Sequence, residues 1–228
     1  MRLPTDDAAL KRELSVAMLD DNELIALARS VVEADGTVVC AALDALDERF
    51  IRVARLISSS QGKVLVTGSG ASGATAARTA HILSVCGTPA FYLPPTDGLH
   101  GGLGVLQPND LILALSKGGG SKELNEFCSR AKSLCRSVIA VTAAPKSALA
   151  EIADHVIELT IDDNADLGEV IATGSSLAIA AVLDAICEIA RVSRDYDWRR
   201  LLFTHPSGAV GRDAAQTIKR LADSSTSE

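Results

Sequence analysis

Five short apolar runs alternate with helix-like segments from residue 63 onward, and this alternation is the feature that most limits the possible folds. Helical patterns occupy residues 72–86, 120–134 and 146–153 between the runs, and a longer one covers 174–192 after the last run. Strands that alternate with helices imply right-handed crossovers and a parallel sheet. Ligands of such sheets bind outside the carboxyl ends of the strands. The predicted strands are 63–67, 89–93, 110–116, 137–142 and 155–161.

Composition limits the class of protein. A chain of 228 residues can bury one sizeable core, and its 47% apolar and 3% aromatic content makes that core aliphatic. The formal charge of −7, without a basic block, argues against a nucleic-acid partner, although local amides can still bind a small anion. The first residues lack an apolar signal core, and the longest apolar run, within 177–190, contains Asp184 and Glu188. We therefore expect a cytoplasmic protein without a membrane span.

The five cysteines form no C-x-x-C pair and lie in apolar, helix-like segments. They are interpreted as small buried thiols of a reducing compartment rather than as metal ligands or nucleophiles.

Residues 1–60 carry no strand signal and are predicted to form a helical arm. One helix is expected over about 21–34, and Gly36 and Thr37 are expected to break it and to cap a second helix over 39–57. Such an arm either packs against a neighbouring subunit or caps its own sheet. The second helix is predicted from apolar residues at steps of four and three, namely Val39, Leu43, Leu46, Phe50, Val53 and Ile57.

The loop "VTGSGASG" after the first predicted strand matches G-x-G-x-x-G. A dinucleotide site also needs an acidic residue at the end of the second strand, where this chain has Pro94 and Pro95. Free amides at the start of the 72–86 helix suit a phosphate or a sugar hydroxyl equally well.

Two further loops are rich in hydroxyls. In "SKGGGS", Ser116, Ser121 and the amides of 118–120 are predicted to form a concave anion site at a helix N-terminus, because a plain turn needs only one glycine. In "ATGSS", Thr173, Ser175 and Ser176 are predicted to cap the last long helix and to leave spare hydroxyls.

Two histidines lie in glycine-rich turns. His100 stands within "GLHGGLG", where an acid/base role and a structural role are both open. His205 begins "HPSGAVGR", a turn stiffened by proline near the end of the chain. Four acids crowd the loop before "ATGSS", and any one of them is a candidate base: Asp162, Asp163, Asp166 and Glu169.

Together these motifs resemble the sugar isomerase (SIS) domain, and most of all the arabinose 5-phosphate isomerases of the KpsF/GutQ group. The resemblance runs from about residue 25 to 213 and rests on "VTGSGASG", "HGGLGVLQPNDLILALS" and "THPSGAVGR". It implies an α/β, flavodoxin-like SIS fold with a five-stranded parallel sheet flanked by helices. The implied organisation is an N-terminal arm over 1–60, the SIS domain over 61–213 and a tail over 214–228.

The resemblance also implies the site. Ser69 and Ser72 are expected beside the sugar, His100 and His205 match the group's two histidines, and the group's catalytic acid corresponds to Asp163 or Glu169. No metal or nucleotide cofactor is implied, and the expected assembly is a homotetramer with active sites shared between subunits. The expected phosphate-binding side chains are Ser116, Ser121, Thr173, Ser175 and Ser176.

The chain departs from the group at three positions. Ala71 stands where the group has lysine, Gly120 where it has glutamate, and Ala172 where a proline is common. Paired CBS modules, which many members carry, are not expected, because the chain ends about 15 residues after "HPSGAVGR".

The predicted activity is the interconversion of an aldose phosphate and a ketose phosphate through an enediol, with His205 or Glu169 as base and His100 as polar partner. The alternative is a non-catalytic sugar-phosphate-binding protein, which the lost lysine and glutamate favour and the two histidines oppose. An isomerase for a different sugar phosphate also fits the altered loops. A DNA-binding regulator is disfavoured, because the arm is short and lacks basic character.

Overall fold

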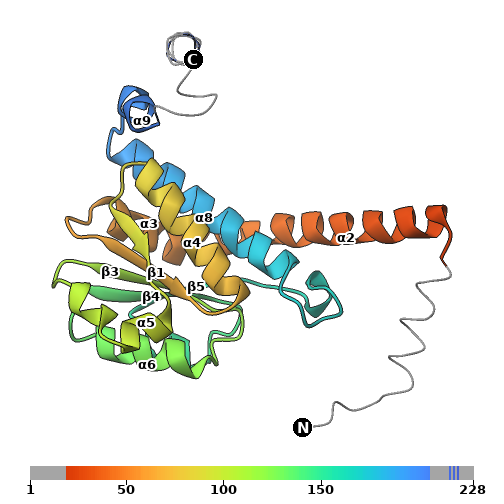
Figure 1. Cartoon of the computed structure of the whole chain (residues 1–228), viewed down its shortest axis with the longest axis horizontal. Helices are drawn as coiled ribbons and strands as arrows, with labels where there is room; N and C mark the ends of the chain where they lie inside the picture. The colour runs from red at the N-terminus through yellow and green to blue at the C-terminus, as the bar shows by residue number, and fades with distance from the viewer. Residues whose placement is uncertain (1–18, 206–215, 217, 219, 221–228) are drawn as a thin grey trace.

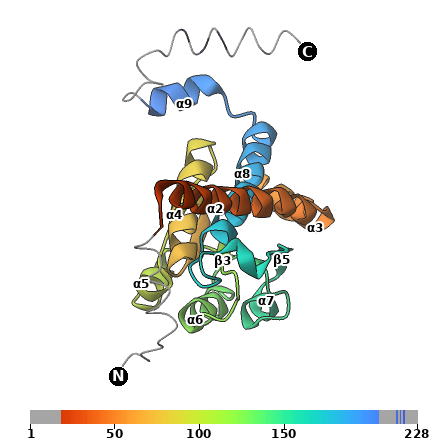
Figure 2. The same cartoon turned by 90° about the vertical axis from the view of Figure 1, so that its right-hand side faces the viewer.

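The protein is a three-layer α/β sandwich, described here by a computed structural model for residues 19–205, 216, 218 and 220. Five parallel strands form one sheet in the order β2-β1-β3-β4-β5, with a layer of helices on each face (Figures 1 and 2). The strands are β1 Val64–Gly68, β2 Ala90–Tyr92, β3 Leu111–Leu115, β4 Ser137–Thr142 and β5 His155–Glu158.

Alternate strand residues face the two helical layers, which is why the central strands β1, β3 and β4 are buried throughout. Val66, Leu113 and Val141 pack under α2, α3, α4 and α8, whereas Leu65 and Ile112 pack with α6 and α7 on the other face. The short α5 lies beside α6 (Figure 1). The helices are α2 Asp21–Ala41, α3 Glu48–Ser58, α4 Ala71–Val85, α5 Pro95–Leu99, α6 Lys122–Ala131, α7 Ala148–Ile152, α8 Gly174–Ser193 and α9 Trp198–Thr204. Short 3₁₀ turns cover Ala42–Ala45, Gly102–Val105 and Asp163–Ala165.

The predicted parallel sheet is confirmed, and the strand bounds agree to within one residue except at β5, which ends three residues earlier than expected. The predicted helices over 72–86, 120–134, 146–153 and 174–192 correspond to α4, α6, α7 and α8. None of the described helices is both long enough and apolar enough to cross a bilayer.

The prediction for the N-terminal arm is wrong in its division. Gly36 and Thr37 lie inside α2, and the break comes later, where Leu46 turns and the Asp47 carboxylate accepts hydrogen bonds from the amides of Arg49 and Phe50 to start α3. A side-chain cap satisfies amides that an unbroken helix would bond internally, so Asp47 fixes the new helix start. Of the predicted apolar stripe, Phe50, Val53 and Ile57 are buried, whereas Leu43 is 68% exposed and Leu46 is 40% exposed.

The order of the strands creates a switch point between β1 and β3. The connection after β1 leads into α4 on one face, whereas the connection after β3 leads into α6 on the other face (Figure 2). The two loops therefore diverge above the carboxyl ends of adjacent strands and leave a crevice between them, which is where open α/β sheets bind ligands.

The last long helix leads away from this crevice. α8 starts beside the carboxyl end of β3, and the guanidinium of Arg194 at its far end donates to the carbonyl oxygens of Ile57 and Ser60, just before β1 begins. α9 follows beyond that opposite edge of the sheet (Figure 1). Of the "HPSGAVGR" turn only His205 belongs to the described residues.

Candidate functional site

Two serines meet across the switch point. Ser69 directly follows β1 and Ser121 directly precedes α6, and their hydroxyl oxygens lie 3.4 Å apart. Ser116, which follows β3, accepts a hydrogen bond from the amide of Gly119 at 3.0 Å. The sheet thus brings together three of the serines that the sequence singled out.

Gly119 fixes the shape of the loop between β3 and α6. Its φ is 61°, and a Cβ atom at this position would collide with the side chain of Ser147. Its carbonyl accepts hydrogen bonds from the amide of Leu149 and the side-chain amide of Asn125. Across the described part of the chain, no hydrogen bond engages the amides of Gly118 and Gly120, so two donors remain open beside Ser116 and Ser121.

An acidic side chain already uses one of the hydroxyls. Ser121 donates to the carboxylate of Glu123 at 3.1 Å, and the backbone amide of Glu123 and then the Ser121 hydroxyl lower the pKa of this carboxyl. Acidic groups are stabilised at the start of a helix, which is the location that a phosphate would also prefer. Sequence reasoning missed Glu123, although its place in the first turn of a predicted helix was a usable signal.

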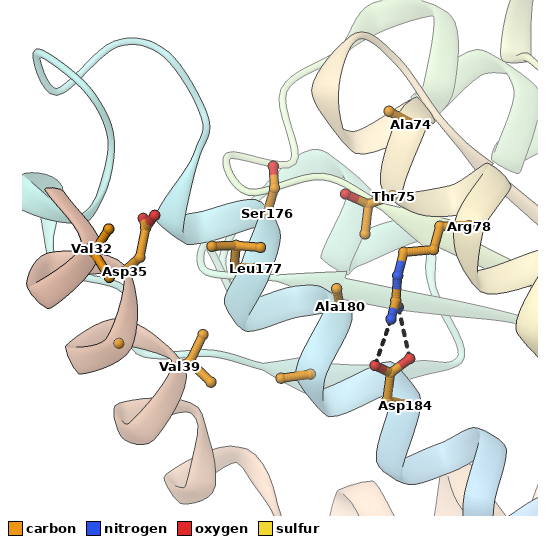
Figure 3. Close-up of a pocket in the computed structure, with 12 residues that line it drawn as sticks. Val32, Asp35, Val39, Ala74, Thr75, Arg78, Ser176, Leu177, Ala180 and Asp184 are labelled. Carbon is orange, nitrogen blue, oxygen red and sulfur yellow. Dashed lines mark hydrogen bonds and ion pairs between the residues drawn. The ribbon is translucent and has the colours of Figure 1, made fainter. Parts of the chain in front are cut away.

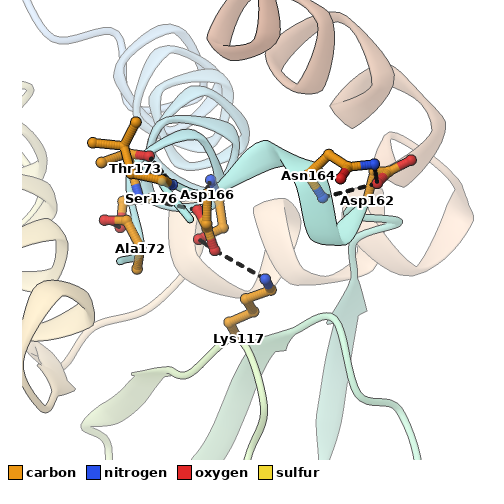
Figure 4. A network of polar contacts seen from close by, with 9 residues as sticks. Lys117, Asp162, Asn164, Asp166, Ala172, Thr173 and Ser176 are labelled. Carbon is orange, nitrogen blue, oxygen red and sulfur yellow. Dashed lines mark hydrogen bonds and ion pairs between the residues drawn. The ribbon is translucent and has the colours of Figure 1, made fainter. Parts of the chain in front are cut away.

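A buried carboxylate organises the loop before α8. Asp166 is 6% exposed, and its Oδ1 accepts from the amides of Thr173 and Ser175, each at 2.9 Å. Its Oδ2 accepts from the Ser175 hydroxyl at 2.9 Å. The same oxygen accepts from the Lys117 ammonium, also at 2.9 Å (Figure 4). Burial raises the pKa of Asp166, but the hydrogen bonds from Lys117, Ser175 and Thr173 outweigh burial, so this pKa lies below its ordinary value.

This network leaves fewer free hydroxyls at α8 than the sequence suggested. Ser175 is 1% exposed and donates to Asp166. The Thr173 hydroxyl accepts from the amide of Leu167, and the Ser176 hydroxyl donates to the carbonyl of Ala172. The predicted role of these three residues in phosphate binding stays a prediction, and Ser175 contributes chiefly to holding the loop.

Lys117 ties the two loops together. Its ammonium reaches Asp166, while its carbonyl accepts hydrogen bonds from the Thr142 hydroxyl and the Ala143 amide. Because its charge is already paired with Asp166, this lysine adds little attraction for an anion.

The predicted acid/base residues do not meet within one chain. His100 is exposed at the end of α5, Glu169 is exposed on a turn with a φ of 61°, and His205 ends α9. Nδ1 of His205 lies 3.2 Å from the carbonyl oxygen of Leu201. Among the described residues, no hydrogen bond joins any of these three side chains to the serines of the switch point.

Tyr92 is a further side chain at the switch point. Its hydroxyl donates to the carbonyl of Gly68 at 3.4 Å, and a Cβ atom on Gly73 would come within 2.8 Å of it. Burial, and then the charge of Asp97, raise the pKa of Tyr92. Ser72, predicted at the sugar, is half-buried in the first turn of α4 near the same loop. Sequence reasoning missed Tyr92, because only the pairing of β2 with β1 places it there.

The cysteines differ in burial. Cys128 and Cys187 are buried, and burial raises the pKa of each to about 12, whereas Cys40 is exposed on α2, contrary to expectation. Within the described part of the chain, no cluster of three or more His, Cys, Asp or Glu side chains could hold a metal ion.

Comparison with known proteins gives consistent results. The pattern of the SIS domain matches residues 56–189. The chain is similar to the arabinose 5-phosphate isomerase GutQ of Salmonella typhi, with 31% identity over 77% of this chain and 55% of the relative. GutQ of Escherichia coli K12 is 32% identical over the same shares. The chain therefore spans about half the length of the curated relatives it matches.

A solved structure extends the similarity to the fold. A protein from Escherichia coli CFT073, solved in complex with arabinose 5-phosphate, superposes with a TM-score of 0.79 at 25% identity. The superposition covers 82% of this chain and 100% of the other.

Proposed function

The chain belongs to the SIS domain family, and from this premise we propose that it is a sugar-phosphate isomerase that interconverts an aldose phosphate and a ketose phosphate. Arabinose 5-phosphate is the first substrate to test, because the similar isomerases carry that name. The open amides of Gly118 and Gly120, beside Ser116 and Ser121 at the switch point, are the observation that carries the proposal.

The reaction needs a clamp and two proton-transfer groups. A base removes the proton from C2 of the aldose while a donor protonates the oxygen at C1. The enediol then regains a proton at C1 and loses the hydroxyl proton at O2, which leaves the ketose. A clamp on the distal phosphate positions C1 and C2, so that binding energy contributes to rate.

In this proposal the phosphate binds at the loop between β3 and α6. Ser116, Ser121 and the two open amides donate to it, with the start of α6 behind them. The sugar then lies toward Ser69 and Ser72, and the hydroxyls of Thr173 and Ser176 border the same rim. No metal or nucleotide is part of the proposal.

The proton-transfer groups come from more than one subunit. α8 has 20 residues and separates the switch point from α9, a length of about 30 Å. His205 therefore serves the site of another copy in a homotetramer with shared sites. His100 is the polar partner, and Glu169 is the alternative base. We place this enzyme in the cytoplasm and propose no nucleic-acid or membrane partner.

The direct test is incubation with arabinose 5-phosphate, and with a panel of other aldose and ketose phosphates, in deuterated water. Magnetic resonance should show the partner sugar with deuterium at C1 or C2. A ligand that binds without exchange would instead identify a sugar-phosphate-binding protein, the alternative that Ala71 and Gly120 favour because they replace the group's lysine and glutamate. Failure of the whole panel to bind would overturn both.

The His205→Asn variant separates the two functions. An acid/base group contributes typically 10²–10⁴-fold to rate, so turnover should fall by about that factor while phosphate binding stays nearly intact. Full activity of this variant would remove His205 from the mechanism and leave Glu169 or His100 as the base.

A further inference from the structure

An apolar groove runs along one side of the protein, between α2, α4 and α8. It has a volume of about 710 Å³, and its lining includes Val32, Gly36, Ala74, Leu177 and Ala180 (Figure 3). A small hollow beside Val39 is lined by Leu43, Leu46 and Ala181, which extends the apolar surface. Contiguous apolar surface at the exterior of a soluble protein is one mark of an interaction site.

The groove is poorly suited to a small anion. Arg78 is the one cation among the described residues of its lining, and both carboxylate oxygens of Asp184 accept hydrogen bonds from it, at 2.7 and 2.8 Å (Figure 3). The other charged group in the lining is Asp35, which repels anions. An apolar occupant is therefore favoured over a phosphorylated ligand.

The helix α2 carries two apolar stripes. One includes Leu24, Leu27 and Val38, and Val38 packs into the domain's own core. The other is Ile25, Val32, Gly36 and Val39, which recur at steps of seven, four and three and lie along the groove from Val32 onward. The domain's own core buries only the first stripe. Burial of the second stripe requires another packing surface.

The first half of α2 has no support within the chain as described. Every residue from 21 to 30 is exposed, and this half projects past the sheet (Figure 1). Helices shorter than about 12–15 residues are marginal in water without packing. The projecting half, with Ile25 at 52% exposure, thus needs a surface of the kind that the groove offers.

Gly36 is the unusual residue of this helix. It lies inside α2, and a Cβ atom added to it would have nothing within 4 Å. Glycine in an exposed helix interior costs about 1 kcal/mol relative to alanine, so the chain gives up stability at a position that its own fold leaves open. Close approach of another backbone explains this choice.

The charges on α2 are placed to pair with those on a second copy of the helix. Arg29 and Glu33 lie one turn apart on one flank of the second stripe, and within the described residues neither forms an ion pair. When a helix packs antiparallel against a copy of itself, the same flank of each copy comes together. Arg29 of one copy then faces Glu33 of the other.

We propose that the groove is an isologous interface, in which α2 of a second copy packs antiparallel along α2 through the stripe Ile25, Val32, Gly36 and Val39. This rests on the assembly in the proposed function, deepens it, and assigns one of the surfaces that a homotetramer needs. The helix α2 both lines the groove and carries the exposed apolar stripe. One two-fold contact between two copies of α2 therefore fills the groove and buries the stripe.

Substitution of Gly36 tests the backbone approach. Gly36→Leu should strengthen the isolated helix yet weaken self-association by at least about tenfold, as measured by the dissociation constant from analytical ultracentrifugation. Thr37→Leu is the matched control, because Thr37 neighbours Gly36 but lines neither the groove nor the hollow. If Gly36→Leu associates as well as the wild type, α2 does not pack there.

Charge reversal tests the antiparallel pairing. Arg29→Glu and Glu33→Arg should each associate weakly alone, because like charges then face each other, and should associate with one another when mixed. Only a contact between two copies of α2 produces this recovery. Equal association of each variant alone and mixed would overturn the proposed pairing.

Photo-crosslinking identifies the occupant directly. A benzophenone residue replaces Ala74, at the edge of the groove, in a chain labelled with ¹⁵N that is mixed with unlabelled protein. The expected product is a crosslinked dimer of one labelled and one unlabelled chain. After digestion with trypsin, the labelled peptide that carries the benzophenone should be joined to the unlabelled peptide that ends at Arg29. A crosslink only to the labelled chain's own terminal segments, or to a different protein, would overturn the proposal. These measurements need no substrate, so they stand apart from any failure of the isomerase assay.

Discussion

The loops that follow β3 and β5 look alike in the sequence but differ in the structure. Both are rich in hydroxyls and precede a helix. In the first loop the amides of Gly118 and Gly120 are open among the described residues. In the second, Asp166 accepts hydrogen bonds from the amides of Thr173 and Ser175 and from the Ser175 hydroxyl.

The difference shows what makes a helix start available to a ligand. A buried carboxylate that lies within the loop acts as an internal anion and satisfies the donors. A loop without such an acceptor keeps its donors for a ligand. The first loop is thus the better phosphate site. The second loop is held in place by its own hydrogen bonds and borders that site.

The largest effect is expected on the free energy of unfolding, when Asp166, the internal anion of the second loop, is removed. Asp166→Ala should lower the free energy of unfolding by about 3–5 kcal/mol, because it leaves the Lys117 ammonium and two amides without their acceptor. Urea unfolding followed by circular dichroism measures this. Asp162→Ala is the control, since Asp162 is exposed and its side chain, within the described residues, bonds only Asn164. Equal losses in both variants would mean that the second loop has no special anchor.

Acid should weaken the same anchor. The pKa of Asp166 is lowered in the folded protein, so its contribution to stability is present above its unfolded pKa of about 3.9 and is lost as the pH falls through the folded value. Thermal melts of wild type and Asp166→Asn from pH 6 downward should therefore converge in the acid range. Parallel curves over that range would show that Asp166 is not the titrating group.

Serine substitutions should separate the two loops. Ser116→Ala and Ser121→Ala should each weaken phosphosugar binding about tenfold or more, since a hydrogen bond to a charged group is worth roughly 1.5–3 kcal/mol. Ser175→Ala should instead cost about 1–3 kcal/mol of stability and leave affinity nearly unchanged. Calorimetric titration and urea unfolding of the three variants give both quantities. The comparison fails if Ser175→Ala weakens binding as much as the other two.

The smallest effect is expected at Glu123. Its carboxylate holds the Ser121 hydroxyl and repels an incoming phosphate, so Glu123→Gln should raise phosphosugar affinity by about two- to fivefold, and less at high salt. Glu126→Gln, one turn further along α6 and paired with Arg130, is the control. Weaker binding by Glu123→Gln would show that the carboxylate positions the ligand instead of competing with it.

Local pattern was sufficient to predict the architecture. Short apolar runs and the helices between them determine the parallel sheet, because each element's period is set by neighbours in the sequence. The same pattern located the switch-point serines Ser69, Ser116 and Ser121, since strand ends must share one edge of the sheet. The helix boundary within the arm was predicted wrongly. The continuous apolar stripe over 39–57 predicted one helix, but the Asp47 side chain caps a new helix within that stripe.

Partners distant in the sequence were decided only by the tertiary structure. Asp166 reaches Lys117 across 49 positions, and Tyr92 reaches Gly68 across 24. Whether a hydroxyl or an amide is free depends on such partners, and composition cannot reveal them. The sequence by itself therefore determined the sheet and the edge that carries the site, whereas packing decided which donors on that edge remain open. The physical reason is that periodicity is a local property, while the satisfaction of a hydrogen bond depends on every group that folding brings within about 3 Å.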